Sequence, residues 1–222
     1  MEISVRKLIN PSDDEIDALV SMLDRAFVNS SSTIQSSGWL FRFLTDGKRE
    51  LAAKYVYRGH VLAGLLEGEV WVAGQSGTNA IRAAAVWFPP GIDALVTEAQ
   101  RSAAEWDQFI SKLSQEKRTW WSDYFLPTTE EASASLIGRH MGLKSWHLLL
   151  LGTDPDHQGK GLSTALIRAV ESKASAERVS MVVGTSELTN VAYYQKLGFV
   201  VRGAVPIDIG DDQLMLTTLT KP

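Results

Sequence analysis

The sequence predicts an α/β fold in which helices cover both faces of one mixed sheet. Two features of the chain predict this fold. Between residues 145 and 218, segments with strand and helix patterns alternate in the order β-α-β-α-β. Upstream, residues 69–73 and 80–88 have the pattern of two strands joined by a turn at residues 75–79. Strands and helices that alternate in this way form a sheet whose connecting helices pack on its faces.

The first part of the chain is expected to supply one strand and one amphipathic helix. The strand is predicted around residues 3–9, and the run from Pro11 to Asp14 contains the residue types that begin a helix. Apolar residues then recur at helical spacing from Ile16 to Phe27. The polar run at residues 29–33 is expected to end this helix.

Two longer segments are rich in aromatic residues. Residues 34–66 are expected to form one or two helices, and residues 92–140 are expected to be mostly helical. Within the second segment, a helix that carries Trp120, Trp121, Tyr124 and Phe125 is expected to end at Pro127, because proline breaks a helix interior.

The stretch from Leu148 to Val170 has the pattern of a strand, a glycine-rich turn and a helix. Four consecutive leucines precede the turn, and apolar residues recur at helical spacing from Leu162 onward. The first turn of a helix has N–H groups without internal partners and a partial positive charge. The amides from Gly159 to Thr164 are therefore expected to bind an anion, most naturally a phosphate or pyrophosphate.

The spacing in this turn excludes two common phosphate-binding patterns. A P-loop requires Lys followed by Ser or Thr, whereas Lys160 is followed by Gly161. A dinucleotide-binding fingerprint requires a third glycine where this chain has Thr164. What remains is Gln158, Gly161 and Ser163, which resembles the Gln/Arg-x-x-Gly-x-Gly/Ala signature of the GNAT superfamily of N-acetyltransferases. Ser163 departs from the usual Gly or Ala, and its small size predicts that it is tolerated.

A second segment strengthens the resemblance. Residues 190–199 read Asn-Val-Ala-Tyr-Tyr-Gln-Lys-Leu-Gly-Phe and resemble a later motif of the same superfamily, in which a helix that carries a tyrosine ends at Gly-Phe. Gly198 suits the end of a helix, and Phe199 opens the next strand. The two motifs occur in the family's order and at its usual separation. The resemblance implies the GNAT fold, with a mostly antiparallel sheet and a splayed central pair of strands.

The resemblance also implies how the chain is divided. Residues 1–222 would form one acetyltransferase domain, with residues 145–200 as its acetyl-CoA-binding core. Residues 34–66 and 92–140 would be helical inserts on the side of the acceptor.

Acetyl-CoA is the cofactor that this resemblance implies. Backbone groups at the end of the central strand would pair with its pantetheine arm, and the turn would hold its pyrophosphate. The residues implied in cofactor binding are Leu151, Thr153, Gln158, Gly159, Lys160, Gly161, Leu162, Ser163, Thr164 and Asn190. A solvated turn explains Lys160 equally well, and a helix cap explains Asn190 equally well.

Two residues are candidates for catalysis. Tyr194 matches the tyrosine with which the family protonates the departing CoA thiolate, whereas its neighbour Tyr193 is expected to be a packing residue. His147, six residues before Thr153, is the candidate general base, since a Glu or His near this strand position acts as the base in several members, often through water. A histidine in an apolar strand is also often an ordinary core residue. Three acidic residues remain as alternative bases: Glu67, Glu69 and Asp208.

Composition excludes several other classes of protein. The 222-residue chain has a net charge of −4 and a pI near 5.6, which argues against a nucleic-acid partner. It has no cysteine, so a disulfide framework, a cysteine nucleophile and a thiolate metal site are impossible. Residues 1–6 lack the pattern of a signal peptide, and no apolar run approaches the roughly 20 residues of a membrane span. We therefore expect a soluble, cytoplasmic protein, either a monomer or a homodimer, with no membrane partner.

The predicted function is acetyl transfer from acetyl-CoA to the amine of a small molecule, by direct attack of the amine on the thioester. Residues 146–199, and more loosely residues 70–87, look similar to the puromycin N-acetyltransferase-like members of the superfamily. This resemblance carries over the cofactor half and not the substrate. An antibiotic, a toxin or another xenobiotic is a candidate acceptor. The aromatic inserts favour an apolar or aromatic amine, although ordinary core packing also explains them. A protein or peptide acetyltransferase and a non-catalytic acyl-CoA-binding protein remain open alternatives.

Overall fold

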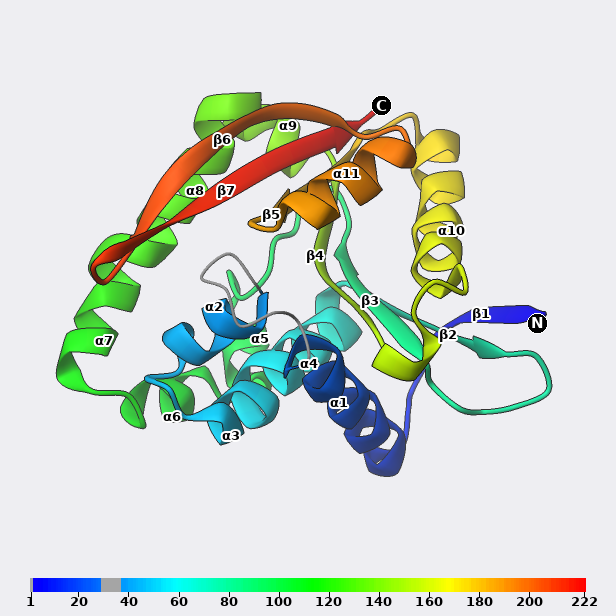
Figure 1. Ribbon diagram of the computed structural model, residues 1–222, viewed down its shortest axis with the longest axis horizontal. Coiled ribbons are helices and arrows are strands. Elements are labelled where there is room, and N and C mark those ends of the chain that lie inside the picture. The colour runs from blue at the N-terminus through cyan, green and yellow to red at the C-terminus, as the bar shows by residue number, and fades with distance from the viewer. Residues whose placement is uncertain (1, 29–36) are drawn as a thin grey trace.

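A seven-stranded sheet forms the centre of the molecule, with the strand order β1-β2-β3-β4-β5-β7-β6 (Figure 1). The computed structural model describes residues 2–28 and 37–222. Neighbouring strands are antiparallel except for β4 and β5, which are parallel. This confirms the predicted mixed, mostly antiparallel sheet. The strands are β1 (Ile3–Lys7), β2 (Glu69–Gln75), β3 (Ala83–Phe88), β4 (Trp146–Thr153), β5 (Met181–Thr185), β6 (Val200–Ile209) and β7 (Asp212–Lys221).

Helices connect the strands and occupy the segments where the sequence predicts them. The first is α1 (Asp13–Val28), and the polar run expected to end it lies outside the described residues. The first aromatic segment forms α2 (Ser37–Leu44), α3 (Arg49–Leu51), the π-helical η1 (Ala52–Tyr57) and α4 (Arg58–Glu67). The second forms α5 (Glu98–Ala103), α6 (Trp106–Ser111), α7 (Gln115–Trp120), the π-helical η2 (Trp121–Phe125), α8 (Leu126–Ile137) and α9 (Arg139–Leu143). The C-terminal part contains the 3₁₀ turn η3 (Pro155–His157), α10 (Leu162–Glu177) and α11 (Leu188–Lys196).

The prediction that Pro127 ends the aromatic helix is wrong. Helical backbone runs without a break from Gln115 to Ile137, and Pro127 lies in the first turn of α8. The preceding residues, Trp121–Phe125, form a π-helical turn. Proline has no N–H group to donate in either type of helix. Pro127 lies directly after Leu126, whose N–H group makes the i→i−5 bond to the Trp121 carbonyl oxygen, and before the i→i−4 bonds of α8, so the missing donor falls where the two patterns meet and the helix continues.

The two faces of the sheet have separate cores. On one face, α10 covers β1 to β4, and Leu162, Leu166 and Val170 pack with Trp146 and Leu148 of β4. The opposite face carries α1, α4 and the aromatic inserts, and Figure 1 shows α1 and α10 on opposite sides of β3 and β4. The predicted arrangement of helices on both faces is therefore confirmed.

Several aromatic residues of the inserts are fully part of the core on the α1 face. The buried ones are Tyr55, Tyr57, Phe109 and Trp121. For these four residues the structure supports ordinary core packing. A second group packs instead against the end of the β6–β7 hairpin, where Ile207, Ile209 and Leu214 are buried; it consists of Trp39, Phe43, Trp120, Tyr124 and Phe125. In the described part of the chain, no helix is long and apolar enough to span a bilayer.

Candidate functional site

Strands β4 and β5 separate in the middle of the sheet. Their parallel pairing ends at Leu148 and Val183, although β4 continues to Thr153. On the other side of β4, the N–H group of Asp154 donates to the carbonyl oxygen of Arg82 at 2.8 Å. Backbone groups along an antiparallel ladder alternate in direction, so those of Leu151 and Thr153 point away from β3 and into the space beside β5. The structure thus has the predicted splay. Leu151 and Thr153 have no strand partner on the β5 side, although the carbonyl oxygen of Thr153 accepts a hydrogen bond from Gln158 Nε2 at 3.4 Å.

A β-bulge marks the point where the two strands separate. Val86 of β3 pairs with Leu150 and Trp87 pairs with Leu148, which leaves Leu149 without a partner on β3. Because of the extra residue, side chains two positions apart point to opposite faces of β4. Leu148 packs in the α10 core, whereas Leu150 packs in the α1 core. Bulges commonly end pairing and redirect side chains next to functional sites.

The glycine loop, residues 158–161, leads from β4 and η3 into α10. Gly159 and Gly161 have φ values of +71° and +82°, which disfavour any residue with a Cβ atom. A Cβ atom at Gly159 would meet nothing within 4 Å, so the loop is open on that side. Among the described residues, the N–H groups from Gly159 to Thr164 have no hydrogen-bond acceptor. They form a row of free donors at the start of a 16-residue helix, as an anion site requires.

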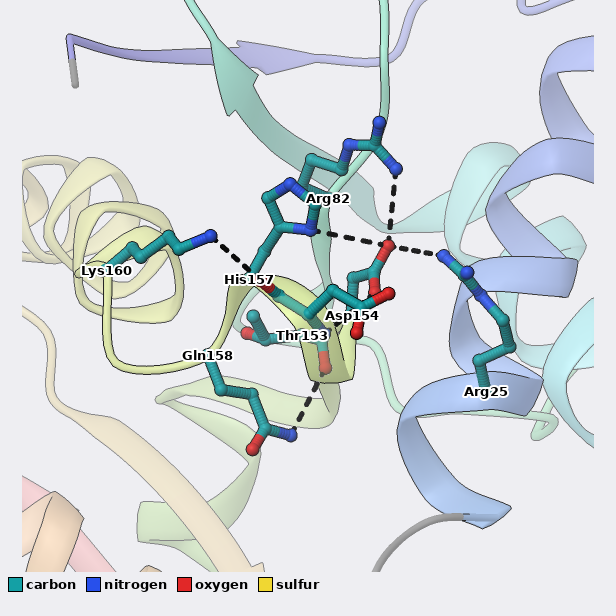
Figure 2. Close-up of polar contacts among 8 residues, drawn as sticks. Arg25, Arg82, Thr153, Asp154, His157, Gln158 and Lys160 are labelled. Carbon is teal, nitrogen blue, oxygen red and sulfur yellow. Dashed lines mark hydrogen bonds and ion pairs between the residues drawn. The ribbon is translucent and has the colours of Figure 1, made fainter.

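Two side chains of the glycine loop form hydrogen bonds to nearby backbone carbonyl groups. Lys160 donates from Nζ to the carbonyl oxygen of Asp156 at 2.8 Å, and Gln158 donates from Nε2 to the carbonyl oxygen of Thr153 at 3.4 Å (Figure 2). Leu162 is buried beneath the loop in the α10 core. These contacts favour the interpretation of Lys160 as a residue that stabilises the turn.

Asp154, directly after β4, is the centre of an ionic cluster that the sequence analysis did not identify. Its carboxylate is completely buried and pairs with the guanidinium groups of Arg25 and Arg82 (Figure 2). Burial alone would raise the pKa of Asp154, but the hydrogen bond from the Asp156 N–H group and the nearby positive charges hold that pKa below its usual range. Asp154 is therefore ionised at neutral pH.

The two tyrosines of α11 have different environments. Tyr194 is buried and packs edge-on against Tyr193 and Phe199, with ring centroids 5.3 and 5.5 Å apart. Burial, with a smaller contribution from Tyr193 and Glu187, raises the pKa of the Tyr194 phenol above its usual value. Its hydroxyl group therefore stays protonated at neutral pH.

Tyr193 has a more specific contact than the packing role expected for it. Its hydroxyl group donates to Ser163 Oγ at 3.0 Å and lies 3.3 Å from Thr164 Oγ1. The contact joins α11 to the first turn of α10. It also explains how a serine fits where the family signature has Gly or Ala, since the Ser163 hydroxyl group has a partner of its own.

Asn190 does not cap α11. The residue at the N-cap is Glu187, and the N–H group of Asn190 donates to the Glu187 carbonyl oxygen at 3.0 Å, inside the first turn. The side-chain amide of Asn190 lies 3.5 Å from Thr185 Oγ1, at the end of β5. The capping alternative is therefore wrong, because the helix begins three residues earlier than that role requires.

His147 lies on β4 before the bulge and is paired with an acid. Its Nδ1 atom is 3.1 Å from Asp93 Oδ1, and its side chain is 31% exposed, so it is not an ordinary buried core histidine. Burial raises the pKa of Asp93, but the bond from His147 and the 2.7 Å bond from the Ala94 N–H group outweigh this and lower it. An ionised Asp93 that accepts the Nδ1 proton leaves Nε2 of His147 as a proton acceptor.

The alternative bases are held by other contacts. Glu67 accepts hydrogen bonds from Thr97 and Gln100, and Asp208 accepts one from Gln213 at 2.9 Å. Glu69 is bound by Lys7, by Lys173 and by the indole N–H group of Trp71. Its partners make Glu69 a poor proton acceptor.

The contacts of Glu69 predict a stability effect. Burial raises its pKa, but bonds from Lys173, Lys7 and Trp71 outweigh this and lower it. Glu69→Gln should lower the free energy of unfolding at pH 7 by about 2 kcal/mol, less than for a fully buried pair because both lysines are partly exposed. The folded-state pKa of Glu69 is lowered, so the stability difference between wild type and variant should be fully present above the ordinary glutamate pKa of about 4.3. It should be lost as the pH falls from that value through the folded-state pKa. Urea unfolding at pH 7 and pH 3.5 measures both differences; equal values at the two pH values would contradict the prediction.

Among residues 2–28 and 37–222, no three His, Asp or Glu side chains are grouped so as to hold a metal ion. The arrangement offers an anion site, unpaired strand backbone, a protonated phenol and a histidine–carboxylate pair. Such a set suits the binding of an extended phosphate-containing ligand and transfer of an acyl group.

Comparison with known proteins gives a match to one family and to several solved structures. Residues 94–208, just over half of the chain, match the family described as the acetyltransferase (GNAT) domain. The fold is similar to that of arylalkylamine N-acetyltransferase 2 from Aedes aegypti, with a TM-score of 0.64, 14% identity, and coverage of 100% of this chain and 99% of that one. An agmatine N-acetyltransferase gives a TM-score of 0.62 at 17% identity over 99% and 98% of the two chains. Drosophila melanogaster polyamine N-acetyltransferase gives 0.56 at 16% identity over 99% of both. The chain therefore belongs to the GNAT family of acetyltransferases.

Proposed function

We propose that this protein is an acetyl-CoA-dependent N-acetyltransferase that acts on the amine of a small molecule. The observation that carries the proposal is the continuous path from the unpaired backbone of β4 into the glycine loop, with its free N–H groups. The similar structures named above are enzymes for agmatine, polyamines and arylalkylamines, which are all small amines.

The donor would bind along this path. Backbone groups of Leu151 and Thr153 are placed to pair with the pantetheine amides, as an added strand pairs with a sheet edge. The N–H groups from Gly159 to Thr164 would bind the pyrophosphate, and the side chain of Asn190 is available to the same ligand from α11. Acetyl-CoA supplies the activated thioester, and the protein supplies orientation and proton transfer.

The proposed chemistry needs a proton acceptor for the amine and a proton donor for the leaving thiolate. His147, oriented by Asp93, would take the proton from the acceptor ammonium, directly or through water. The neutral nitrogen then attacks the thioester carbonyl carbon, the C–S bond breaks, and Tyr194 donates its proton to the departing sulfur. As the amide forms, the nitrogen loses its second proton, which passes through water to the Tyr194 phenolate and restores the phenol. Backbone N–H groups near the bulge of β4 are the candidate donors to the oxyanion.

Substitution of the base should change the pH dependence of the rate. His147→Gln is expected to lower kcat/KM about tenfold near neutral pH, a modest general-base effect because solvent can also deprotonate the amine. The acidic limb of kcat/KM should move to higher pH, since deprotonation then depends on the amine alone. Asp93 cannot cause this limb, because its lowered pKa keeps it ionised above about pH 4. The exposed His140 on α9 gives a matched control, and an unchanged limb in His147→Gln would remove His147 as the base.

The acceptor would bind on the α1 face. The inserts place Trp39, Phe43 and Trp120 beside the end of the β6–β7 hairpin, where an apolar or aromatic amine would find complementary surface. This region lies on the same face as α1, across the sheet from α10.

The direct test is release of free thiol from acetyl-CoA in the presence of different amines. The panel contains puromycin, agmatine, polyamines, arylalkylamines and short peptides. Turnover with a small amine supports the proposal, and turnover with peptides alone would assign the protein to the peptide acetyltransferases. Absence of turnover, while CoA still raises the melting temperature, would indicate a non-catalytic acyl-CoA-binding protein.

A further inference from the structure

We propose that Asp154 is a positioning residue that couples the glycine loop to helix α1, so that Arg25 on α1 sets the affinity for the donor. The inference rests on the donor site proposed above. It assigns a role in donor binding to a residue on the opposite face of the sheet from α10.

Three separate parts of the chain converge on the Asp154 carboxylate (Figure 2). Its Oδ2 atom pairs with Arg25 from α1 and lies 3.3 Å from Arg82, which precedes β3, and 3.7 Å from His157 Nδ1 in η3. Its Oδ1 atom accepts from the Asp156 N–H group at 3.2 Å. The carboxylate is fully buried, whereas both arginines are partly exposed, so the guanidinium groups close over it from the solvent side.

The same residue fixes the direction in which the chain leaves β4. The Asp154 N–H group donates to the Arg82 carbonyl oxygen, and the Asp154 carbonyl oxygen accepts from the His157 N–H group, both at 2.8 Å. Together with the side-chain cap on Asp156, these bonds set the 3₁₀ turn that aims Gln158 and Gly159 toward α10. Any rotation at Asp154 would therefore move the glycine loop.

Helix α1 is tightly connected to the same end of β4. Gly152 lacks a side chain where α1 crosses it, and a Cβ atom there would lie only 2.8 Å from Leu23 Cδ2 and 3.4 Å from Ala26. Arg25 projects from this contact region to the carboxylate. Asp154 therefore receives one ionic contact from the helix and one from the β2–β3 hairpin, and a shift of either changes its environment.

The charge of Asp154 is the reason why the affinity for CoA should depend on Arg25. Arg25 and Arg82 together neutralise a buried carboxylate, and removal of one leaves part of its charge uncompensated. That charge lies at the base of a loop whose N–H groups must accept a pyrophosphate. The unbalanced carboxylate would repel this anion.

The experiment measures CoA affinity by isothermal titration calorimetry on the full chain. Arg25→Gln should raise the Kd for CoA about tenfold, in the usual range for coupling between sites. The matched control is Arg49→Gln, which removes an ion pair from the neighbouring α1 residue Asp24, at 2.8 Å, but has no contact with the loop. The control should bind CoA as the wild type does.

A double variant separates the coupling from simple destabilisation. In an Asp154→Asn background no buried charge needs to be neutralised, so adding Arg25→Gln should change the Kd less than twofold. Equal Kd values for wild type and Arg25→Gln would overturn the coupling, as would equal losses in Arg25→Gln and Arg49→Gln. If Asp154→Asn does not fold, the Kd values of Arg25→Gln and Arg49→Gln still decide whether Arg25 sets the affinity for CoA. Failure of the wild type to bind CoA would refute the donor site itself, and the coupling with it.

Discussion

Gly161→Glu should abolish measurable CoA binding while the protein stays folded. Gly161 is the N-cap of α10, has a φ of +82° and lies between the loop and the first free N–H groups of the helix. A glutamate there places a negative charge where the pyrophosphate should bind and adds a side chain that obstructs the loop. We expect the Kd for CoA to rise at least about a hundredfold, or about 2.8 kcal/mol. The CoA-induced rise in melting temperature should disappear.

The control for this variant separates charge from backbone strain. Gly77, in the turn between β2 and β3, also has a positive φ, of +79°, and open space around it. Gly77→Glu should therefore have a similar strain, of about 1–2 kcal/mol, and bind CoA normally. Calorimetric titration and a melting curve on both variants provide the comparison. Undiminished CoA affinity in a folded Gly161→Glu protein would exclude this loop as the donor site.

Tyr194→Phe should lower kcat about a hundredfold and leave the KM for acetyl-CoA almost unchanged. General acid catalysis typically contributes at least this factor. Because burial raises the pKa of Tyr194, its phenol stays protonated up to strongly alkaline pH. The wild-type rate should therefore not decline with pH below the ordinary tyrosine pKa of about 10 on account of this residue. Steady-state kinetics across pH 6–10, with a fixed acceptor, measures both effects.

The adjacent tyrosine provides the contrast. Tyr193→Phe removes the hydroxyl contact with Ser163 and Thr164, so it should loosen the first turn of α10 and raise the KM for acetyl-CoA a few-fold, with kcat nearly unchanged. Opposite patterns in the two variants would distinguish a proton donor from a residue that supports the donor loop. An unaltered kcat in Tyr194→Phe would remove it as the general acid.

The donor half of the site is predictable because its determinants are close together in the sequence. The glycine loop, the free N–H groups and α10 all follow from residues 158–170, whose spacing already specifies the turn and the helix. Two details were wrong for local reasons. The helix does not end at Pro127, because the π-helical turn before it has no signal in hydrophobic periodicity. Asn190 does not cap α11, because the start of that helix at Leu188 depends on the conformation of the preceding loop.

The partners of the candidate catalytic residues and of the loop could not be predicted, because they come from distant parts of the chain. Asp93 and His147 are 54 residues apart, and Arg25 and Asp154 are 129 residues apart. Nothing in the turn after Pro89 distinguishes Asp93 from any exposed acid, although an aspartate directly after a buried strand could have drawn attention to Asp154. The bulge at Leu149 likewise depends on the register with β3 and not on the leucine run itself.

The sequence by itself determined the fold class and the glycine loop, because helix periodicity and turn residues act over a few positions. Only the tertiary structure decided which side chains face one another across the sheet. That choice depends on strand register and on where α1 crosses Gly152, and both are set by the packing of the whole core. The ionic contacts of Asp154 and the pairing of His147 with Asp93 exist only because this packing brings distant segments together.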